Sequence, residues 1–140
     1  MDRAFTPNRW VGIVVALFVA GCGGGTIALE GTQRAPGADG SVDLGEVEGN
    51  VMARVEVRHL PPPNRVGQGL TCYVLWLRAP DGSRQSNAGV MQYDEGDRVG
   101  RVTGITPMRV FEVLITAERA ANSASPGPDV VFQRRVQADD

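Results

Sequence analysis

The 140-residue chain contains no lysine, a single histidine and two cysteines, and only 6% of its residues are aromatic. All 14 basic residues are arginine, so chemistry that needs a lysine amine, such as Schiff-base formation, is excluded. A histidine triad or histidine zinc site needs partners that the lone His59 lacks. The formal net charge is −2, and without a basic surplus to hold phosphates we expect no nucleic-acid partner.

The N-terminal segment combines a net positive start with a short apolar run. Arg3 and Arg9 outweigh Asp2, and residues 10–20 are apolar apart from Gly12. A helix that spans a bilayer needs about 20 apolar residues, so this run is too short for one. A basic start followed by a short apolar run is typical of a secretory signal. We therefore predict a signal peptide over residues 1–21.

The predicted signal ends in Leu17-Phe18-Val19-Ala20-Gly21-Cys22, with small residues directly before the cysteine. This segment resembles the lipobox of bacterial lipoproteins, in which the cysteine begins the mature chain and carries lipid. The resemblance implies that Cys22 is lipidated and ties an extracytoplasmic protein to the membrane of the cell envelope. Gly23 rather than aspartate follows, which favours the outer over the inner membrane. The alternative is an ordinary secretory signal that is cut elsewhere.

Removal of residues 1–21 changes the formal charge from −2 to −3 and leaves about 120 residues, which suits one small domain. We expect lipidated Cys22 and a flexible glycine-rich tether over residues 22–50, a domain over 51–136 and a polar tail over 137–140. Short strands at Thr26–Leu29 and Val42–Val47 are the alternative for the tether. With Cys22 lipidated, Cys72 has no partner for an intramolecular disulfide and is expected to be a small buried hydrophobe.

From Val51 onward, apolar residues alternate with polar ones in short segments separated by turn-forming residues. This period of two is typical of half-buried strands. Residues 70–79 are apolar on both faces, as expected of a central strand that is covered on both sides. No window has the pattern of an amphipathic helix. The sequence therefore predicts an all-β protein, an immunoglobulin-like antiparallel β-sandwich, with strands over residues 51–58, 70–79, 88–93, 98–105, 109–118 and 130–136.

Two segments carry a resemblance to a family. Tyr73-Val74-Leu75-Trp76-Leu77 followed by Pro80-Asp81-Gly82, and Thr116-Ala117-Glu118 followed by a Ser/Pro-rich loop, resemble the extracytoplasmic C-terminal domain of anti-sigma-K-type factors. The resemblance covers residues 68–136 and implies an immunoglobulin-like sandwich. That family's sigma-binding region and transmembrane helix are not matched here, and its Gly-Gly after the glutamate is replaced by Arg119-Ala120. No functional residue is therefore carried over.

Three candidate sites emerge from the residue types. Asp94, Glu95 and Asp97 offer hard oxygen ligands to calcium, although a solvated hairpin turn explains them better. Trp76 is either an aromatic binding surface or the central core aromatic of the sandwich, and we favour the core. Cys72 and His59 could form a nucleophile pair only if the fold joins them, and we discount it.

These observations predict a lipid-anchored extracytoplasmic sandwich with a binding or structural role at the cell envelope, where its partners are the membrane and an envelope protein. We expect no catalytic activity and no cofactor. One alternative is a sensory or regulatory module related to anti-sigma ectodomains. A hydrolase or metal-dependent enzyme is the other alternative, which the lack of a convincing catalytic constellation disfavours.

Overall fold

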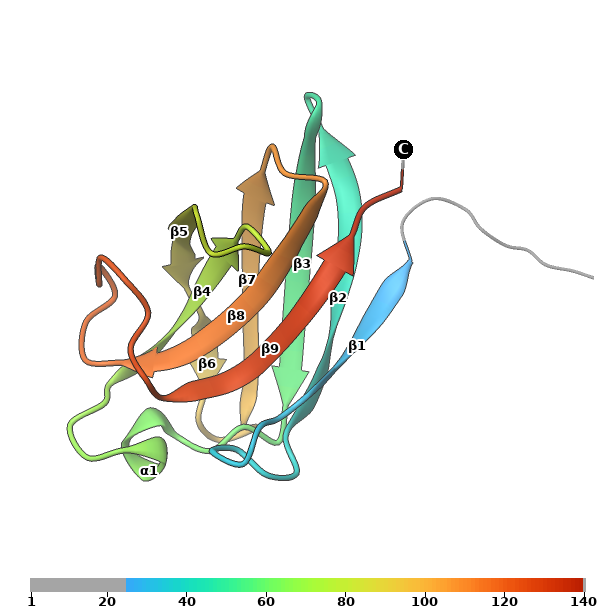
Figure 1. The fold of residues 1–140 in the computed structure, drawn as a ribbon. Coiled ribbons are helices and arrows are strands. Elements are labelled where there is room, and N and C mark those ends of the chain that lie inside the picture. The colour runs from blue at the N-terminus through green and yellow to red at the C-terminus, as the bar shows by residue number, and fades with distance from the viewer. Residues whose placement is uncertain (1–24, 140) are drawn as a thin grey trace, which may run out of the picture.

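The computed structural model describes residues 25–139, and these form two antiparallel sheets packed face to face (Figure 1). One sheet has the strand order β1-β2-β3-β7-β6 and the other β5-β4-β8-β9. The predicted all-β antiparallel sandwich is confirmed, while its immunoglobulin-like character stays a prediction. The elements are β1 (Thr26–Glu30), β2 (Asp39–Val47), β3 (Asn50–Arg58), α1 (Pro63–Val66), β4 (Cys72–Arg78), β5 (Gln85–Val90), β6 (Gln92–Asp94), β7 (Val99–Thr106), β8 (Val110–Glu118) and β9 (Val130–Gln137).

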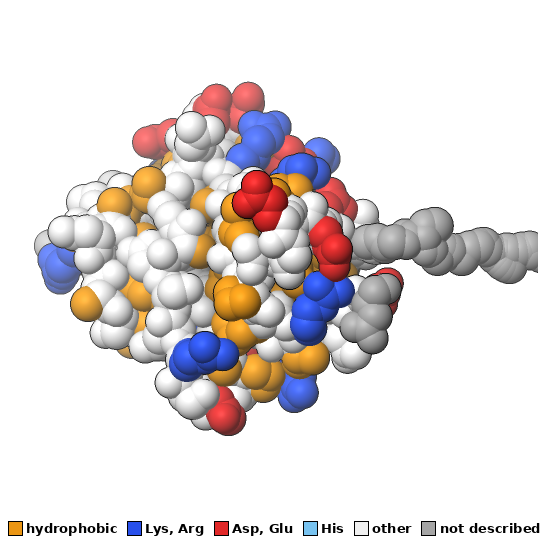
Figure 2. Space-filling view, turned by 90° about the horizontal axis from the view of Figure 1, so that it is seen from above, with side chains coloured by type: hydrophobic (Ala, Val, Ile, Leu, Met, Phe, Trp, Pro, Cys, Tyr) orange, Lys and Arg blue, Asp and Glu red, His pale blue; other side chains and the backbone are white. Residues whose placement is uncertain are grey.

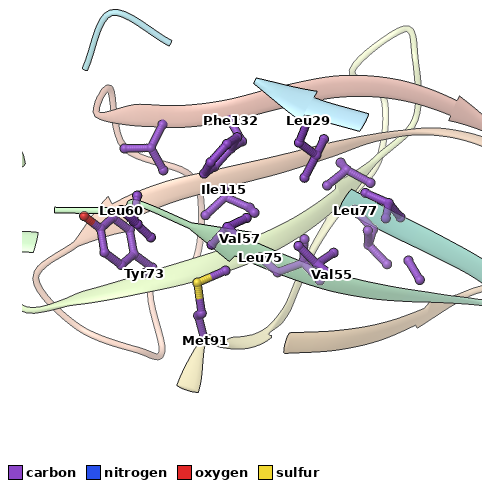
Figure 3. Close-up of a cluster of buried hydrophobic side chains, with 14 of the residues drawn as sticks. Leu29, Val55, Val57, Leu60, Tyr73, Leu75, Leu77, Met91, Ile115 and Phe132 are labelled. Atoms are coloured by element: carbon purple, nitrogen blue, oxygen red, sulfur yellow. The ribbon is translucent and has the colours of Figure 1, made fainter. Parts of the chain in front are cut away.

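The main hydrophobic core fills the space between the two sheets. The period-two pattern places alternate residues of each strand there, because successive side chains of a strand point to opposite faces. Val55 and Val57 of β3 meet Leu75 and Leu77 of β4 across the interface, and Phe132 of β9 joins them (Figure 3). All five side chains are buried. Leu29 of β1 belongs to the same cluster, so the core draws on strands from both ends of the described chain.

Strands β1 and β2, which lie in the glycine-rich stretch 26–47, belong to the first sheet, so the flexible tether expected over residues 22–50 is wrong for this stretch. Thr26–Glu30 pairs in register with Asp43–Asp39, and all of β2 pairs with β3. Gly40 is a packing requirement, because a β-carbon there would lie 2.5 Å from the Glu56 carbonyl oxygen of β3. The domain thus begins at β1 and not at Val51.

The expected polar tail over residues 137–140 also begins too early. Gln137 ends β9 and pairs with Val110 of β8. The amide of Ala138 donates to the Arg109 carbonyl at 2.8 Å, and Ala138 is buried. The second sheet therefore extends into the segment that was expected to be a tail.

The strand predicted over residues 88–93 is divided between the two sheets. Gln85–Val90 pairs with β4 in the second sheet, whereas Gln92–Asp94 pairs with β7 in the first. The change occurs at Met91, whose amide still donates to the Tyr73 carbonyl at 2.8 Å. The crossing brings Met91 against Gly100 of β7, where a β-carbon would lie 2.2 Å from the Met91 sulfur.

Two tyrosines fasten the segment that leaves β3. The hydroxyls of Tyr73 and Tyr93 donate to the backbone carbonyls of Pro61 and Leu60, respectively, and the rings make an edge-to-face contact with centroids 5.5 Å apart. Burial raises the pKa of both phenols, and that of Tyr73 lies far above its usual value. The proline-rich connection Leu60–Pro63 is thereby held against the core.

Candidate functional site

The structure separates the residues that the sequence proposed as sites. Cys22, the predicted lipidation site, lies outside the described residues 25–139. No helix in that range has the length and apolar character to cross a membrane. The remaining candidates lie on different strands and turns of the sandwich.

Asp94, Glu95 and Asp97 lie at an exposed turn between β6 and β7. One carboxylate oxygen of Asp94 accepts a hydrogen bond from the Asp97 amide at 3.0 Å, which closes the turn. Within residues 25–139, no three His, Cys, Asp or Glu side chains are grouped so that they could hold a metal ion. The geometry of Asp94 is therefore that of a turn-forming aspartate.

His59 and Cys72 lie at the ends of strands in different sheets and have different partners. His59 follows β3 with a left-handed backbone, φ 57°, and its Nδ1 lies 2.7 Å from Asp39 Oδ1 on the exposed surface. Cys72 begins β4, is half-buried, and lies 3.6 Å from the Glu118 carbonyl oxygen. His59 thus has the contacts of an exposed residue that follows a strand. Cys72 has those of a packed residue at the start of a strand.

Trp76 is fully buried, so the predicted core role is confirmed, but it lies in a second core cluster and not at the centre of the main core as expected. It packs with Val74 and Leu114 in a second, smaller cluster on the outer face of the second sheet. Leu75 and Leu77, on the opposite face of β4, belong to the main core. The predicted two-sided burial of this strand is therefore confirmed, and its outer face needs a cover.

The loop between β8 and β9, residues 119–129, supplies a cover for this outer face. Asn87 of β5 and Leu114 of β8 pair with Trp76 on either side and share its face. The Asn87 amide group donates to the carbonyls of Ala121 and Ser123 at 2.9 and 3.1 Å. Because this loop leaves from β8 and is bonded to β5, it crosses the intervening strand β4 on the Trp76 side.

A buried polar chain joins Trp76 to this loop. The indole N–H of Trp76 donates to Thr116 Oγ1 at 2.8 Å, and that hydroxyl donates to Glu118 Oε2 at 2.5 Å. The same carboxylate oxygen accepts the Gly127 amide at 2.8 Å. Since an indole N–H can only donate, the Thr116 proton must point toward the carboxylate. These hydrogen bonds thus fix the rotamers of the buried side chains of Trp76, Thr116 and Glu118. They also hold loop 119–129 at Gly127.

A hollow of about 540 Å³ lies beside Glu118, between loop 119–129 and the segment that follows α1. The second carboxylate oxygen, Oε1, faces Ser123 Oγ at 3.4 Å, a long hydrogen bond. At the rim, Gly69 has φ 83° and leaves room for Arg119, whose Nη1 would lie 2.4 Å from a β-carbon there. Asp129 is also part of the lining and is ion-paired with Arg34 at 2.9 Å. The hollow therefore presents both signs of charge around a buried carboxylate.

The Glu118 carboxylate has a structural role in this hollow. The lining residues include no histidine or cysteine, and the Glu118 carboxylate is occupied in holding its own loop. Sequence reasoning did not single out Glu118 as a site residue. The available signal was Thr116 and Glu118 on the strand face opposite the apolar residues Phe111, Val113, Ile115 and Ala117.

Comparison with known proteins gives no family for this chain. No protein-family model matches the sequence, and no curated protein matches it at a significant level.

Proposed function

We propose that this protein is a lipid-anchored extracytoplasmic lipoprotein whose β-sandwich has a binding or structural role at the cell envelope. The observation that carries the proposal is Cys22, which follows a short apolar run and the small residues Ala20 and Gly21. The position of β1 supports it, because the folded domain begins four residues after the cysteine. Gly23 favours the outer membrane as the site of anchorage.

Binding is favoured over catalysis by how the reactive side chains are used. Glu118 holds loop 119–129, Cys72 packs beside the Trp76 cluster, and His59 is engaged by Asp39 on the surface. The hollow beside Glu118 combines concavity with polar groups, the features that mark recognition sites. We propose that this hollow and loop 119–129 form the surface that contacts an envelope partner.

A sensory or regulatory module related to anti-sigma ectodomains is the second candidate. The motifs that carry that resemblance lie together in the structure, because Trp76 and Glu118 are joined through Thr116. This contact between the two motifs is the structural support for the second candidate. It supports no sigma-factor contact, so the proposed partner is an envelope protein.

Membrane partition tests the anchor. The parent and Cys22→Ser are expressed in a Gram-negative host, and the envelope is separated from the soluble fraction and washed with high salt. We expect the parent to stay in the salt-washed outer-membrane fraction and to be released only by detergent. The Cys22→Ser variant should leave that fraction, and equal retention of the two proteins contradicts lipid anchorage through this residue.

Partner binding is tested by cross-linking in intact envelopes. The matched pair is the parent and Arg119→Glu, which reverses one charge at the rim of the hollow while leaving Glu118 in place. A specific cross-linked protein that is lost in the variant supports the hollow as the contact surface. Recovery of no specific protein, or the same protein at the same yield from both, contradicts it.

A further inference from the structure

One oxygen of the Glu118 carboxylate lacks a hydrogen-bond donor, although the residue is only 8% exposed. Oε2 accepts two hydrogen bonds, from the Thr116 hydroxyl and the Gly127 amide. In the described part of the chain, the one donor group within reach of Oε1 is the Ser123 hydroxyl, at 3.4 Å. That hydroxyl has a single proton and lies closer, at 2.8 Å, to the Ala120 carbonyl oxygen. The proton therefore goes to Ala120, and Oε1 keeps two unused lone pairs.

Several other carboxylates of the sandwich are paired with arginine. Glu46 Oε2 lies 2.8 Å from Arg109 Nη1 at the end that carries the β2–β3 turn. Figure 2 looks onto this end and shows acidic and arginine side chains next to one another. Glu112 Oε1 of β8 lies 2.7 Å from Arg78 Nη2 of β4. Among residues 25–139, Glu118 has no such cation, although a buried charge needs a partner more than an exposed one does.

The carboxylate can be reached from the hollow of about 540 Å³ beside it. Glu118, Ser123 and Gly127 all line this hollow, and their contacts surround the carboxylate. A β-carbon at position 127 would lie 3.3 Å from both carboxylate oxygens, so the glycine keeps them uncovered. Leu70 and Ala117 add apolar surface to the lining. A ligand group with an apolar stem therefore fits the approach to Oε1.

The hydrogen bonds at Oε2 decide which kind of cation fits best. A guanidinium binds a carboxylate most favourably through a bidentate fork to both oxygens. Thr116 and Gly127 already use both lone pairs of Oε2, so that fork is not available. A lysine ammonium is a compact point charge that can donate to Oε1 alone, and its stem can pack on Leu70 and Ala117. The hollow thus suits a primary ammonium group.

Arg119 presents the opposite charge at the rim of the hollow. It is exposed, and within the described residues it forms no ion pair with a carboxylate. Asp129, the other acidic residue of the lining, is already paired with Arg34 at 2.9 Å. The hollow therefore has a vacant acceptor inside and an unpaired guanidinium at its edge. These two groups complement a ligand that carries both an ammonium and a carboxylate.

Given the recognition role proposed above for the hollow, we propose that the envelope partner inserts a lysine side chain whose ammonium donates to Glu118 Oε1. An acidic residue of the same partner lies against Arg119. The β8–β9 loop stands out beyond the strands (Figure 1), so a side chain on a protein surface can reach the hollow beside it. The bound ammonium supplies the donor that Oε1 lacks, and it polarises the hydrogen bonds that run through Thr116 to the Trp76 indole.

A lysine analogue tests this chemistry. The probe is 6-aminohexanoate, which combines the ammonium and stem of lysine with a carboxylate, whereas pentylammonium lacks the carboxylate and hexanoate lacks the ammonium. Each is titrated into the protein purified from membranes in a zwitterionic detergent. Proton–nitrogen correlation NMR follows the indole N–H signal of Trp76, which is assigned by its loss in Trp76→Phe.

We expect a saturable shift of the Trp76 signal with 6-aminohexanoate and none with hexanoate. Pentylammonium should bind about threefold more weakly, because it makes no ion pair with exposed Arg119. In Arg119→Gln the two cationic probes should bind equally. The absence of a saturable shift with 6-aminohexanoate, or an equal shift with hexanoate, overturns the proposal.

Glu118→Gln is the decisive variant, because it should keep the loop in place. The two donors at Oε2 require an oxygen there, so the amide nitrogen takes the position of Oε1 and presents N–H groups to the hollow. We expect this variant to bind 6-aminohexanoate about tenfold or more weakly than the parent. The control Glu95→Gln, at the exposed turn between β6 and β7, should bind like the parent. Equal binding by Glu118→Gln and the parent overturns the proposal.

Cross-linking in intact envelopes separates this chemistry from the recognition role on which it rests. We expect Glu118→Gln to lose the partner that the parent captures and Glu95→Gln to keep it. A partner that is lost in Arg119→Glu but kept at full yield in Glu118→Gln overturns the inserted lysine alone. Recovery of no specific protein from the parent overturns the recognition role as well.

Discussion

Replacing Thr116 by valine tests the buried chain that joins Trp76 to loop 119–129. Valine keeps the shape and strand preference of threonine but removes the hydroxyl that accepts from the indole and donates to Glu118. Trp76 and Thr116 are both 0% exposed, so water cannot replace the lost partner of the indole N–H.

The expected magnitude follows from these contacts. An unsatisfied buried donor costs about 1–3 kcal/mol, and a hydrogen bond to a charged group contributes about 1.5–3 kcal/mol. We therefore expect Thr116→Val to lower the free energy of unfolding by about 2–4 kcal/mol, a large part of the roughly 5–15 kcal/mol typical of a domain. The control, Thr103→Val at an exposed position of β7, should change it by less than about 0.5 kcal/mol.

The assay is a double-mutant cycle with Trp76→Phe, followed by urea unfolding of residues 25–140 with far-ultraviolet circular dichroism. The phenylalanine has no N–H to leave unsatisfied, so Thr116→Val should cost less in its presence. We expect the double variant to be more stable than the sum of the single changes predicts, by about 1 kcal/mol or more. Additivity within about 0.5 kcal/mol would refute the direct coupling of indole and hydroxyl.

Two further predictions concern the glycines of β2 and the buried tyrosines. Gly40→Ala should lower the midpoint of thermal unfolding, because its β-carbon would lie 2.5 Å from a backbone oxygen. The control Gly45→Ala, whose β-carbon would have its nearest contact at 3.5 Å, should leave the midpoint nearly unchanged. Equal midpoints for the two variants would contradict the close approach of β2 and β3. The raised phenol pKa values of Tyr73 and Tyr93 mean that the folded state keeps protons that the unfolded state loses, so stability should be full below pH about 10 and fall as the pH rises further. Unfolding free energies measured across that range should fall less steeply in Tyr73→Phe, and an unchanged slope would argue against burial of this phenol.

Hydrophobic patterning predicted five of the six strands expected from Val51 onward, because their period of two records which face is buried. For example, Val55 and Val57 alternate with Arg54, Glu56 and Arg58, and both valines lie in the main core as expected. The same pattern showed that β4 is covered on both faces. The pattern could not show what covers the outer face of β4, because the cover is loop 119–129, which lies more than 40 residues further along the chain.

The misassigned stretches have identifiable physical causes. Glycine suggested flexibility in residues 26–47, but Gly40 is needed where two backbones approach closely. The strand expected over residues 88–93 changes sheets at Met91, and its alternation carries no mark of that crossing. The sequence did not single out Glu118, because the loop that buries it is recognisable only in three dimensions.

Intact mass spectrometry of the membrane-purified protein tests the central claim most directly. The account predicts a mature chain that begins at Cys22 and carries acyl mass, and no such species from Cys22→Ser. A mature chain that begins at another residue, or one that begins at Cys22 without acyl mass, would contradict it.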